Sequence, residues 1–258
     1  MTTTTQERPP SEERRRTHAH HHTPLTPARV LLVDEILVVV VAGLAVVLAA
    51  LAAYDGGRVL LTWDEPIQRF VEANRGPTLD TVFKQASRLG SNIVIFPAAA
   101  VMAALSWRRC RPLAMFVLAA AALRPLMEFL IKELVDRDRP DIVRMVDGTG
   151  PSHPSGHVLA SLAVWGLLPA VVAIATGSRR WWRVSLVAVM VLIPFIAASR
   201  VYLGVHWATD VFAGLLIGSL YLLVVEVVFL RWHPDGGCGQ PRSGGPVMSG
   251  PRAGCPPL

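Results

Sequence analysis

The chain has 258 residues, of which 52% are hydrophobic and only 17% are charged, and its mean hydropathy is +0.43. Soluble domains usually carry about 25% charged residues, so this composition favours a membrane protein with several spans. The net charge of +6 does not indicate a nucleic-acid partner. The basic residues form short clusters between apolar runs, and no base-reading motif accompanies them.

Three regions are expected along the chain. Residues 1–30 are rich in Thr, Pro, Arg and His, residues 231–258 are rich in Gly and Pro, and both tails are expected to be disordered. Residues 31–230 hold all the long apolar runs and form the expected folded domain. No cleavage pattern of a secretory signal precedes the first run, which is therefore expected to stay as a membrane anchor.

Six apolar runs are expected to cross the bilayer as helices, whose hydrocarbon core is about 30 Å thick. They cover residues 31–54, 91–107, 113–135, 156–176, 184–202 and 207–230. The polar segment 55–90 carries apolar residues at helical spacing, interrupted by Gly76-Pro77, and predicts two short amphipathic helices on the membrane surface. The predicted fold is an all-α bundle of six transmembrane helices with surface helices between the first two spans.

Basic turns set the expected orientation. Six arginines crowd the turns after the second and fourth spans: Arg108, Arg109, Arg111, Arg179, Arg180 and Arg183. The positive-inside rule places these turns in the cytoplasm. With six spans, both termini lie on that side of the plasma membrane as well.

Alternating spans bring four span ends together at the opposite, extracytoplasmic face. The polar residues at or near those ends are Lys132, Arg139, Ser155, Gly156, His157, Arg200, His206 and Asp210. His206 and Asp210 are four residues apart, one turn on a helix. The carboxylate can then hold one imidazole nitrogen and leave the other free to attack or to accept a proton. Arg200 adds a fork of donors that suits a phosphate.

Three motifs at these ends resemble the signature motifs of the type 2 phosphatidic acid phosphatase superfamily. The first runs from Lys132 to Arg139-Pro140, the second is Pro154-Ser155-Gly156-His157, and the third is Ser199-Arg200 followed by His206 and Asp210. All motif positions are present in the expected order, and the resemblance covers residues 31–230. The triple match is specific, whereas any one motif alone would be weak.

The resemblance implies a covalent phosphohistidine mechanism. His206 would be the nucleophile, and Asp210 would fix its tautomer and stabilise the imidazolium that develops. His157 would protonate the leaving oxygen and then activate water.

The remaining motif residues would bind the phosphate. Lys132, Arg139 and Arg200 would neutralise its oxygens as charge develops. Ser155 and Gly156 would offer backbone N–H groups at the start of a helix. No metal or other cofactor is expected, because the site gathers cations where a magnesium site would gather carboxylates.

Two further charge clusters are expected to have structural rather than catalytic roles. The acidic residues of 136–141 alternate with arginines such as Arg137, and we interpret them as loop charges that compensate one another rather than as a metal site. Arg124 and Glu128 lie four residues apart inside the third span and predict an ion pair. Alternatively, Glu128 positions Lys132.

The predicted function is hydrolysis of a lipid phosphate or diphosphate at the extracytoplasmic face. A polyprenyl diphosphate such as undecaprenyl diphosphate is the leading substrate, and phosphatidylglycerophosphate and phosphatidic acid compete with it. One alternative is a membrane protein that binds or translocates a lipid phosphate without catalysis. Another is a relative of the vanadate-dependent haloperoxidases, which six spans disfavour. The sequence predicts no oligomeric state.

Overall fold

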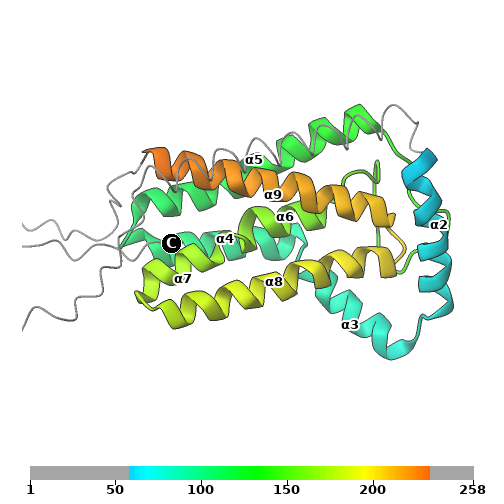
Figure 1. Cartoon of the computed structure of the whole chain (residues 1–258), viewed down its shortest axis with the longest axis horizontal. Coiled ribbons are helices and arrows are strands. Elements are labelled where there is room, and N and C mark those ends of the chain that lie inside the picture. The colour runs from blue at the N-terminus through cyan, green and yellow to red at the C-terminus, as the bar shows by residue number, and fades with distance from the viewer. Residues whose placement is uncertain (1–57, 233–258) are drawn as a thin grey trace, which may run out of the picture. The chain divides into compact units, whose positions relative to one another are not determined.

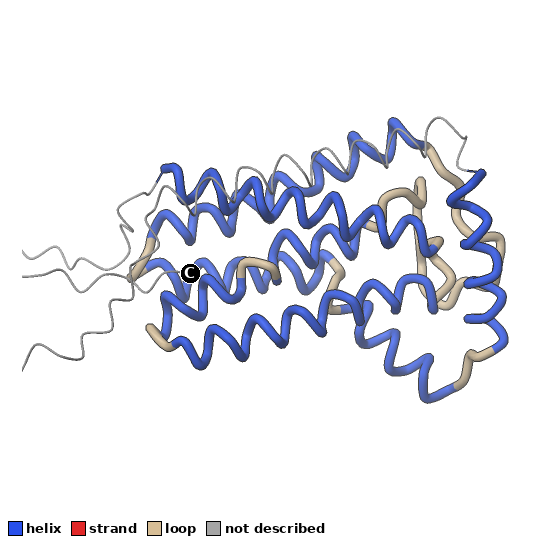
Figure 2. Tube along the Cα trace, viewed as in Figure 1, coloured by secondary structure: helices blue, strands red, loops and turns tan. Residues whose placement is uncertain are grey.

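The computed structural model describes the backbone of residues 58–232 and the side chains of residues 62–232. These residues belong to one compact unit of the chain. The first predicted span, residues 31–54, the predicted N-terminal tail and residues 233–258 lie outside this described part. The predicted C-terminal tail began at residue 231, but residues 231 and 232 belong to the last described helix. Within the described part, every regular element is an α-helix, which agrees with the predicted all-α fold (Figures 1 and 2).

Eight helices follow one another along the described chain. They are α2 (Arg58–Ala73), α3 (Pro77–Arg88), α4 (Asn92–Trp107), α5 (Arg111–Val135), α6 (Gly156–Trp165), α7 (Leu168–Thr176), α8 (Arg179–Tyr202) and α9 (Ala208–Trp232).

The predicted count of six spans is not confirmed. Four stretches of the described chain are long and apolar enough to cross a membrane: α5, α6 with α7, α8 and α9. Helix α4 has 16 residues, fewer than the about 20 that a span needs. Helices α3 and α4 make a fifth candidate only if they are taken together across a bend of 48°.

Segment 55–90 forms the two expected amphipathic helices, α2 and α3. Gly76 is the N-cap of α3 and Pro77 is its first residue, which suits proline because the first helical N–H has no partner inside the helix. Helix α2 lies across the end of the bundle where α8 ends and α9 begins (Figure 1). Contact of these helices with a membrane surface stays a prediction.

Helix α6 lies at the centre of the bundle, and eight of its ten residues are buried. Gly214 and Gly218 form a small-residue face on α9 where the two helices meet. A Cβ on Gly218 would lie 2.6 Å from the Leu162 side chain, so only glycine allows this close approach. The backbone N–H of Ser155 donates to the carbonyl of Asp210 at 3.1 Å. The start of α6 is thereby fixed to the start of α9.

The two basic turns lie at the other end of the bundle from α2 (Figure 1). Arg109 Nη1, after α4, donates to the Ile174 carbonyl near the end of α7 at 3.1 Å. The sequence placed a turn at 177–183, but α8 already begins at Arg179. Arginine is a good helix former, and its long stem lets the charge reach the interface from inside a helix.

Candidate active site

A cavity of about 230 Å³ lies among the ends of α5, α6 and α8 and the loops beside them. Of the eight predicted site residues, the structure brings six to its wall: Lys132, Arg139, Gly156, His157, Arg200 and His206. The other two, Ser155 and Asp210, are fully buried behind it. The convergence expected from alternating spans is therefore present, with both imidazoles at one cavity.

His206 lies in the turn between α8 and α9 and is only 2% exposed. Its Nδ1 is 3.7 Å from Asp210 Oδ2, which is longer than a hydrogen bond, and Nδ1 has no hydrogen-bond partner in the described part of the chain. Burial lowers the pKa of His206 to about 4, against the opposing effect of the Asp210 carboxylate, and the charge of Arg200 lowers it further. The ring is thus neutral at pH 7, the form that a nucleophile needs.

Two buried arginines at the cavity wall have unused hydrogen-bonding capacity. Arg200 is 3% exposed and its Nη1 donates to Ser87 Oγ. The Nε atoms of Arg200 and Arg124 have no partner among the described residues, and neither does Ser155 Oγ. Buried polar groups are normally paired, so these atoms favour a ligand with several oxygen acceptors.

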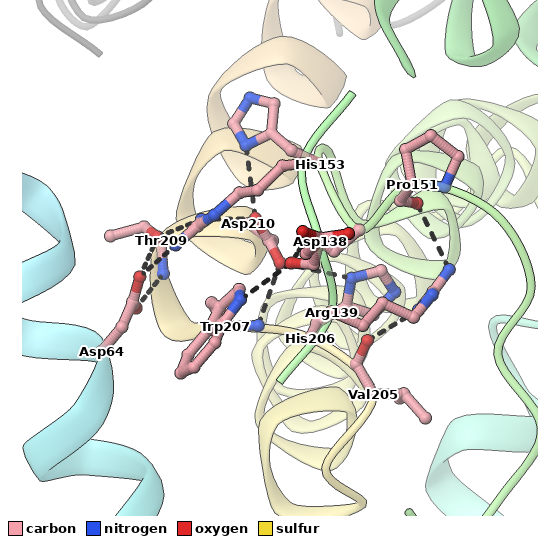
Figure 3. A network of polar contacts seen from close by, with 12 residues as sticks. Asp64, Asp138, Arg139, Pro151, His153, Val205, His206, Trp207, Thr209 and Asp210 are labelled. Carbon is pink, nitrogen blue, oxygen red and sulfur yellow. Dashed lines mark hydrogen bonds and ion pairs between the residues drawn. The ribbon is translucent and has the colours of Figure 1, made fainter. Parts of the chain in front are cut away.

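Arg139 is held by the backbone of the loop around it. Its Nε donates to the Gly150 carbonyl at 2.9 Å, and its Nη1 donates to the Val205 carbonyl at 2.6 Å. Its Nη2 donates to the carbonyls of Thr149 at 2.8 Å and Pro151 at 3.3 Å. Figure 3 shows the contacts with Val205 and Pro151. Burial, and then the charge of Arg144, lowers the pKa of Arg139. Four of its five N–H groups therefore donate to backbone carbonyls. Arg139 presents a fixed positive charge to the cavity, with one N–H group left to donate to a ligand.

The predicted ion pair between Arg124 and Glu128 is confirmed, and it extends to Lys132. Arg124 Nη1 pairs with Glu128 Oε2, while Lys132 Nζ lies 2.9 Å from Glu128 Oε1. A Cβ on Gly156 would overlap the Glu128 carboxylate. An acidic group therefore lies beside the first residue of α6, where the helix end favours an anion.

The interpretation of Arg137 as a compensating loop charge was wrong. Arg137 Nη1 lies 2.6 Å from Asp210 Oδ1, and its Nη2 lies 2.7 Å from Asp64 Oδ2. His153 Nδ1 also approaches Asp210 Oδ1, at 3.4 Å. Asp64 was not singled out from the sequence. The available signal was its place, with Gln68, on one face of α2, opposite exposed apolar residues such as Phe70.

Comparisons with known proteins show which family the chain belongs to. Residues 113–234 match the model of the PAP2 superfamily. The chain is 32% identical over 146 residues to decaprenylphosphoryl-5-phosphoribose phosphatase of Mycobacterium tuberculosis (strain ATCC 25618 / H37Rv), covering 55% of this chain and 76% of that protein. It is 28% identical over 166 residues to phosphatidylglycerophosphatase B of Bacillus subtilis (strain 168), covering 63% and 81%.

A solved structure shares the fold. The crystal structure of a transmembrane PAP2 type phosphatidylglycerolphosphate phosphatase from Bacillus subtilis aligns with a TM-score of 0.70 and 23% identity, over 75% of this chain and 96% of that one. The sequence motifs, the cavity and these similarities lead to one conclusion. The chain belongs to the PAP2 superfamily and is a membrane lipid phosphatase.

Proposed function

We propose that the enzyme transfers the terminal phosphoryl group of a lipid phosphate or diphosphate to His206 and then to water. The observation that supports this reaction best is the cavity that combines two imidazoles with Lys132, Arg139 and Arg200. Cations alone would suffice to bind a phosphate. Two imidazoles at the same cavity supply, in addition, a nucleophile and a separate acid–base group.

In the first step, His206 Nε2 attacks phosphorus and the bond from phosphorus to the lipid oxygen breaks. His157 donates a proton to that leaving oxygen, so the lipid departs as an alcohol or as a lipid monophosphate. Asp210 stabilises the positive charge on the His206 ring, and the 3.7 Å gap between them must shorten for this. Such contacts commonly tighten only when the substrate is bound.

In the second step, His157 takes a proton from water, the water oxygen attacks phosphorus, and the bond to His206 breaks. Inorganic phosphate leaves, and both histidines return to their starting forms. The cations at the cavity wall stabilise the negative charge of each transition state. The proposed reaction uses no metal ion or other cofactor.

The proposed topology places this cavity at the extracytoplasmic face. Both basic turns lie at the far end of the bundle (Figure 1), where the positive-inside rule puts cytoplasm. With both termini also cytoplasmic, the cavity opens where a headgroup can enter while its chains stay in lipid. Because the termini lie outside the described residues, this orientation rests on the charge rule.

For the substrate, we propose a polyprenyl diphosphate first, with phosphatidylglycerophosphate and phosphatidic acid as competitors. The relatives carry names for a decaprenylphosphoryl substrate and for a phosphatidylglycerophosphate. Both kinds of compound place a phosphoryl group at the end of a long apolar anchor, which suits a cavity among apolar helices.

The test uses purified enzyme in detergent with a panel of lipid phosphates and diphosphates, with and without chelator. Phosphate release is expected to persist in chelator and to disappear in His206→Ala. An activated ester such as p-nitrophenyl phosphate needs little acid catalysis, so His157→Ala should still form the phosphoenzyme from it. Because the variant cannot activate water, an alkali-stable phosphoenzyme is expected to accumulate. His206→Ala is expected never to form it. Release that stops in chelator, or a phosphoenzyme in His206→Ala, contradicts the mechanism. Binding without turnover of any substrate would support the non-catalytic alternative.

A further inference from the structure

Helix α9 begins without a capping side chain of its own. The residue before its first turn is Trp207, whose indole offers no acceptor, although Ser, Thr, Asp or Asn usually caps at this place. The N–H of Thr209 instead donates to Asp64 Oδ1 at 3.0 Å, so the cap comes from α2. Asp210 reaches back to the N–H of Trp207 at 2.9 Å, as the acidic residue of a capping box does. Two carboxylates from different helices therefore fix the first turn of α9.

Arg137 joins these two carboxylates. Its Nη2 binds Asp64 Oδ2 at 2.7 Å, and its Nη1 binds Asp210 Oδ1 at 2.6 Å. Thr209 Oγ1 accepts from Arg137 Nη1 at 2.7 Å. It donates to Asp64 Oδ2 at 2.5 Å (Figure 3). Asp64 is 1% exposed and Asp210 is 0% exposed. Both carboxylates are therefore shielded from solvent, while the Arg137 side chain that joins them is 18% exposed.

A stabilising role alone would not require charges at this position, because apolar replacements of buried ion pairs are often neutral or stabilising. The chain of contacts that starts at Asp64 ends at the carboxylate facing His206. We infer that Asp64 is a positioning residue of the phosphatase site, which fixes Arg137 and through it the orientation and effective charge of Asp210. This inference rests on the proposed role of His206 as the nucleophile.

The summed charge of Asp64, Asp210 and Arg137 explains how a second carboxylate would help to stabilise a cationic His206. Arg137 paired with Asp210 alone would leave little net charge to stabilise a positive imidazole ring. With Asp64 added, the two carboxylates and one guanidinium leave a net negative charge beside His206. The ring becomes cationic when it accepts the phosphoryl group, so this charge favours the intermediate.

Helix α2 thereby becomes part of the site, although it lies outside residues 113–234 that match the family. Its inward face carries Asp64 and Gln68, and Gln68 Nε2 donates to the Val201 carbonyl near the end of α8 at 3.4 Å. These contacts hold α2 against the two helix ends that carry Arg200 and Asp210.

Asp64→Asn tests the inference, because it keeps the shape and an acceptor for Thr209 but removes the charge that Arg137 needs. Asp80→Asn is the matched control: Asp80 lies on the neighbouring α3 and accepts a hydrogen bond from Tyr202 Oη at 2.7 Å, away from Asp210. In Asp64→Asn we expect kcat and the rate of phosphoenzyme formation to fall roughly 10- to 100-fold, with KM within about twofold. Asp80→Asn is expected to match the wild type in all three.

The pH dependence of kcat/KM distinguishes a positioning role of Asp64 from a purely structural one, because a structural role alone would not shift its acid limb. His206 is faced by Asp210, Arg200, Arg139 and His157, none of which changes in Asp64→Asn. Losing a nearby carboxylate disfavours the protonated ring, so the acid limb of kcat/KM is expected to move to lower pH than in the wild type with the same substrate.

Wild-type kcat and an unmoved acid limb in Asp64→Asn would overturn the inference, as would equal losses in Asp80→Asn. If Asp64→Asn does not fold, Thr209→Val removes the hydroxyl shared by Asp64 and Arg137 while leaving the charges paired. Its kcat is then expected to fall at unchanged KM, and wild-type kcat would reject the idea. If the wild type itself forms no phosphoenzyme, the proposed function fails instead, so the two failures can be told apart.

Discussion

The Glu128 carboxylate joins two cations of the cavity wall, and Glu128→Gln tests whether it positions one of them. In the structure it pairs with Arg124 on one side and with Lys132 Nζ at 2.9 Å on the other. Glutamine has the same size and keeps an acceptor, but it holds an ammonium group less firmly. Lys132 would then sample positions away from the phosphate.

The size of the effect follows from burial. Hydrogen bonds to charged groups contribute about 1.5–3 kcal/mol, and the lower end applies because the Lys132 and Glu128 side chains are 18% and 17% exposed. A loss of about 1.4 kcal/mol corresponds to roughly tenfold in rate. The carboxylate also lies beside Gly156, where it repels an incoming phosphate. We therefore expect kcat to fall about tenfold while KM stays constant or falls.

Steady-state phosphate release in detergent micelles measures both constants. Glu65→Gln is the control, because Glu65 pairs with Arg69 at 3.2 Å where both side chains are more than 70% exposed. Exposed pairs contribute little, so this variant should behave as wild type. A folded Glu128→Gln enzyme with wild-type kcat and KM would refute the positioning role. A raised KM at constant kcat would show instead that Glu128 helps to bind substrate.

Two further predictions concern His206 and Arg137. Because burial lowers the pKa of His206 to about 4, its contribution to kcat/KM should stay constant from pH 7 to about 5 and fall about tenfold per unit below about pH 4. A rate profile, corrected for substrate ionisation by phosphorus NMR, checks this, and an acid limb at the ordinary value of about 6.5 would contradict it. Arg137→Gln leaves the buried carboxylates of Asp64 and Asp210 without their guanidinium and should cost about 3–5 kcal/mol of stability. Thermal unfolding should show a Tm lower by roughly 6 °C or more, partly restored by adding Asp64→Asn, and an unchanged Tm would show that the pairs contribute nothing.

Patterns local to the sequence predicted the part of the site that faces the cavity. The lengths of the apolar runs fixed most span ends, and alternation of spans then brought His157 and His206 to one end. The four-residue spacing predicted Asp210 beside His206 as one turn of a helix. In the structure His206 lies in the turn before α9, and its ring is 3.7 Å from Asp210 rather than in a hydrogen bond. The count of spans was less secure, because α4 is short and α3 bends away from it by 48°.

The contacts behind the cavity could not be predicted in the same way. By charge alone, Arg137 could pair with its neighbours Asp136 and Asp138, and this local pairing was the simplest interpretation. In the structure α5 ends at Val135, and its C-cap Asp136 has a left-handed backbone with φ 38°. Arg137 then pairs with carboxylates 73 residues away on either side. This pairing depends on the packing of α2 on α9, which the local sequence does not indicate.

The position of Asp210 connects helix α2 with the proposed chemistry. A carboxylate that supports His206 must be close to the ring, yet at the cavity wall it would repel the phosphate. The structure meets both demands by burying Asp210 completely behind the ring. A carboxylate buried there needs a cationic partner, and Arg137 supplies it at 2.6 Å. In the proposed mechanism, that guanidinium would cancel the negative charge that stabilises the His206 cation, unless a second carboxylate shares the guanidinium. In our proposal Asp64 is that carboxylate, and it comes from α2, which lies across the end of the bundle.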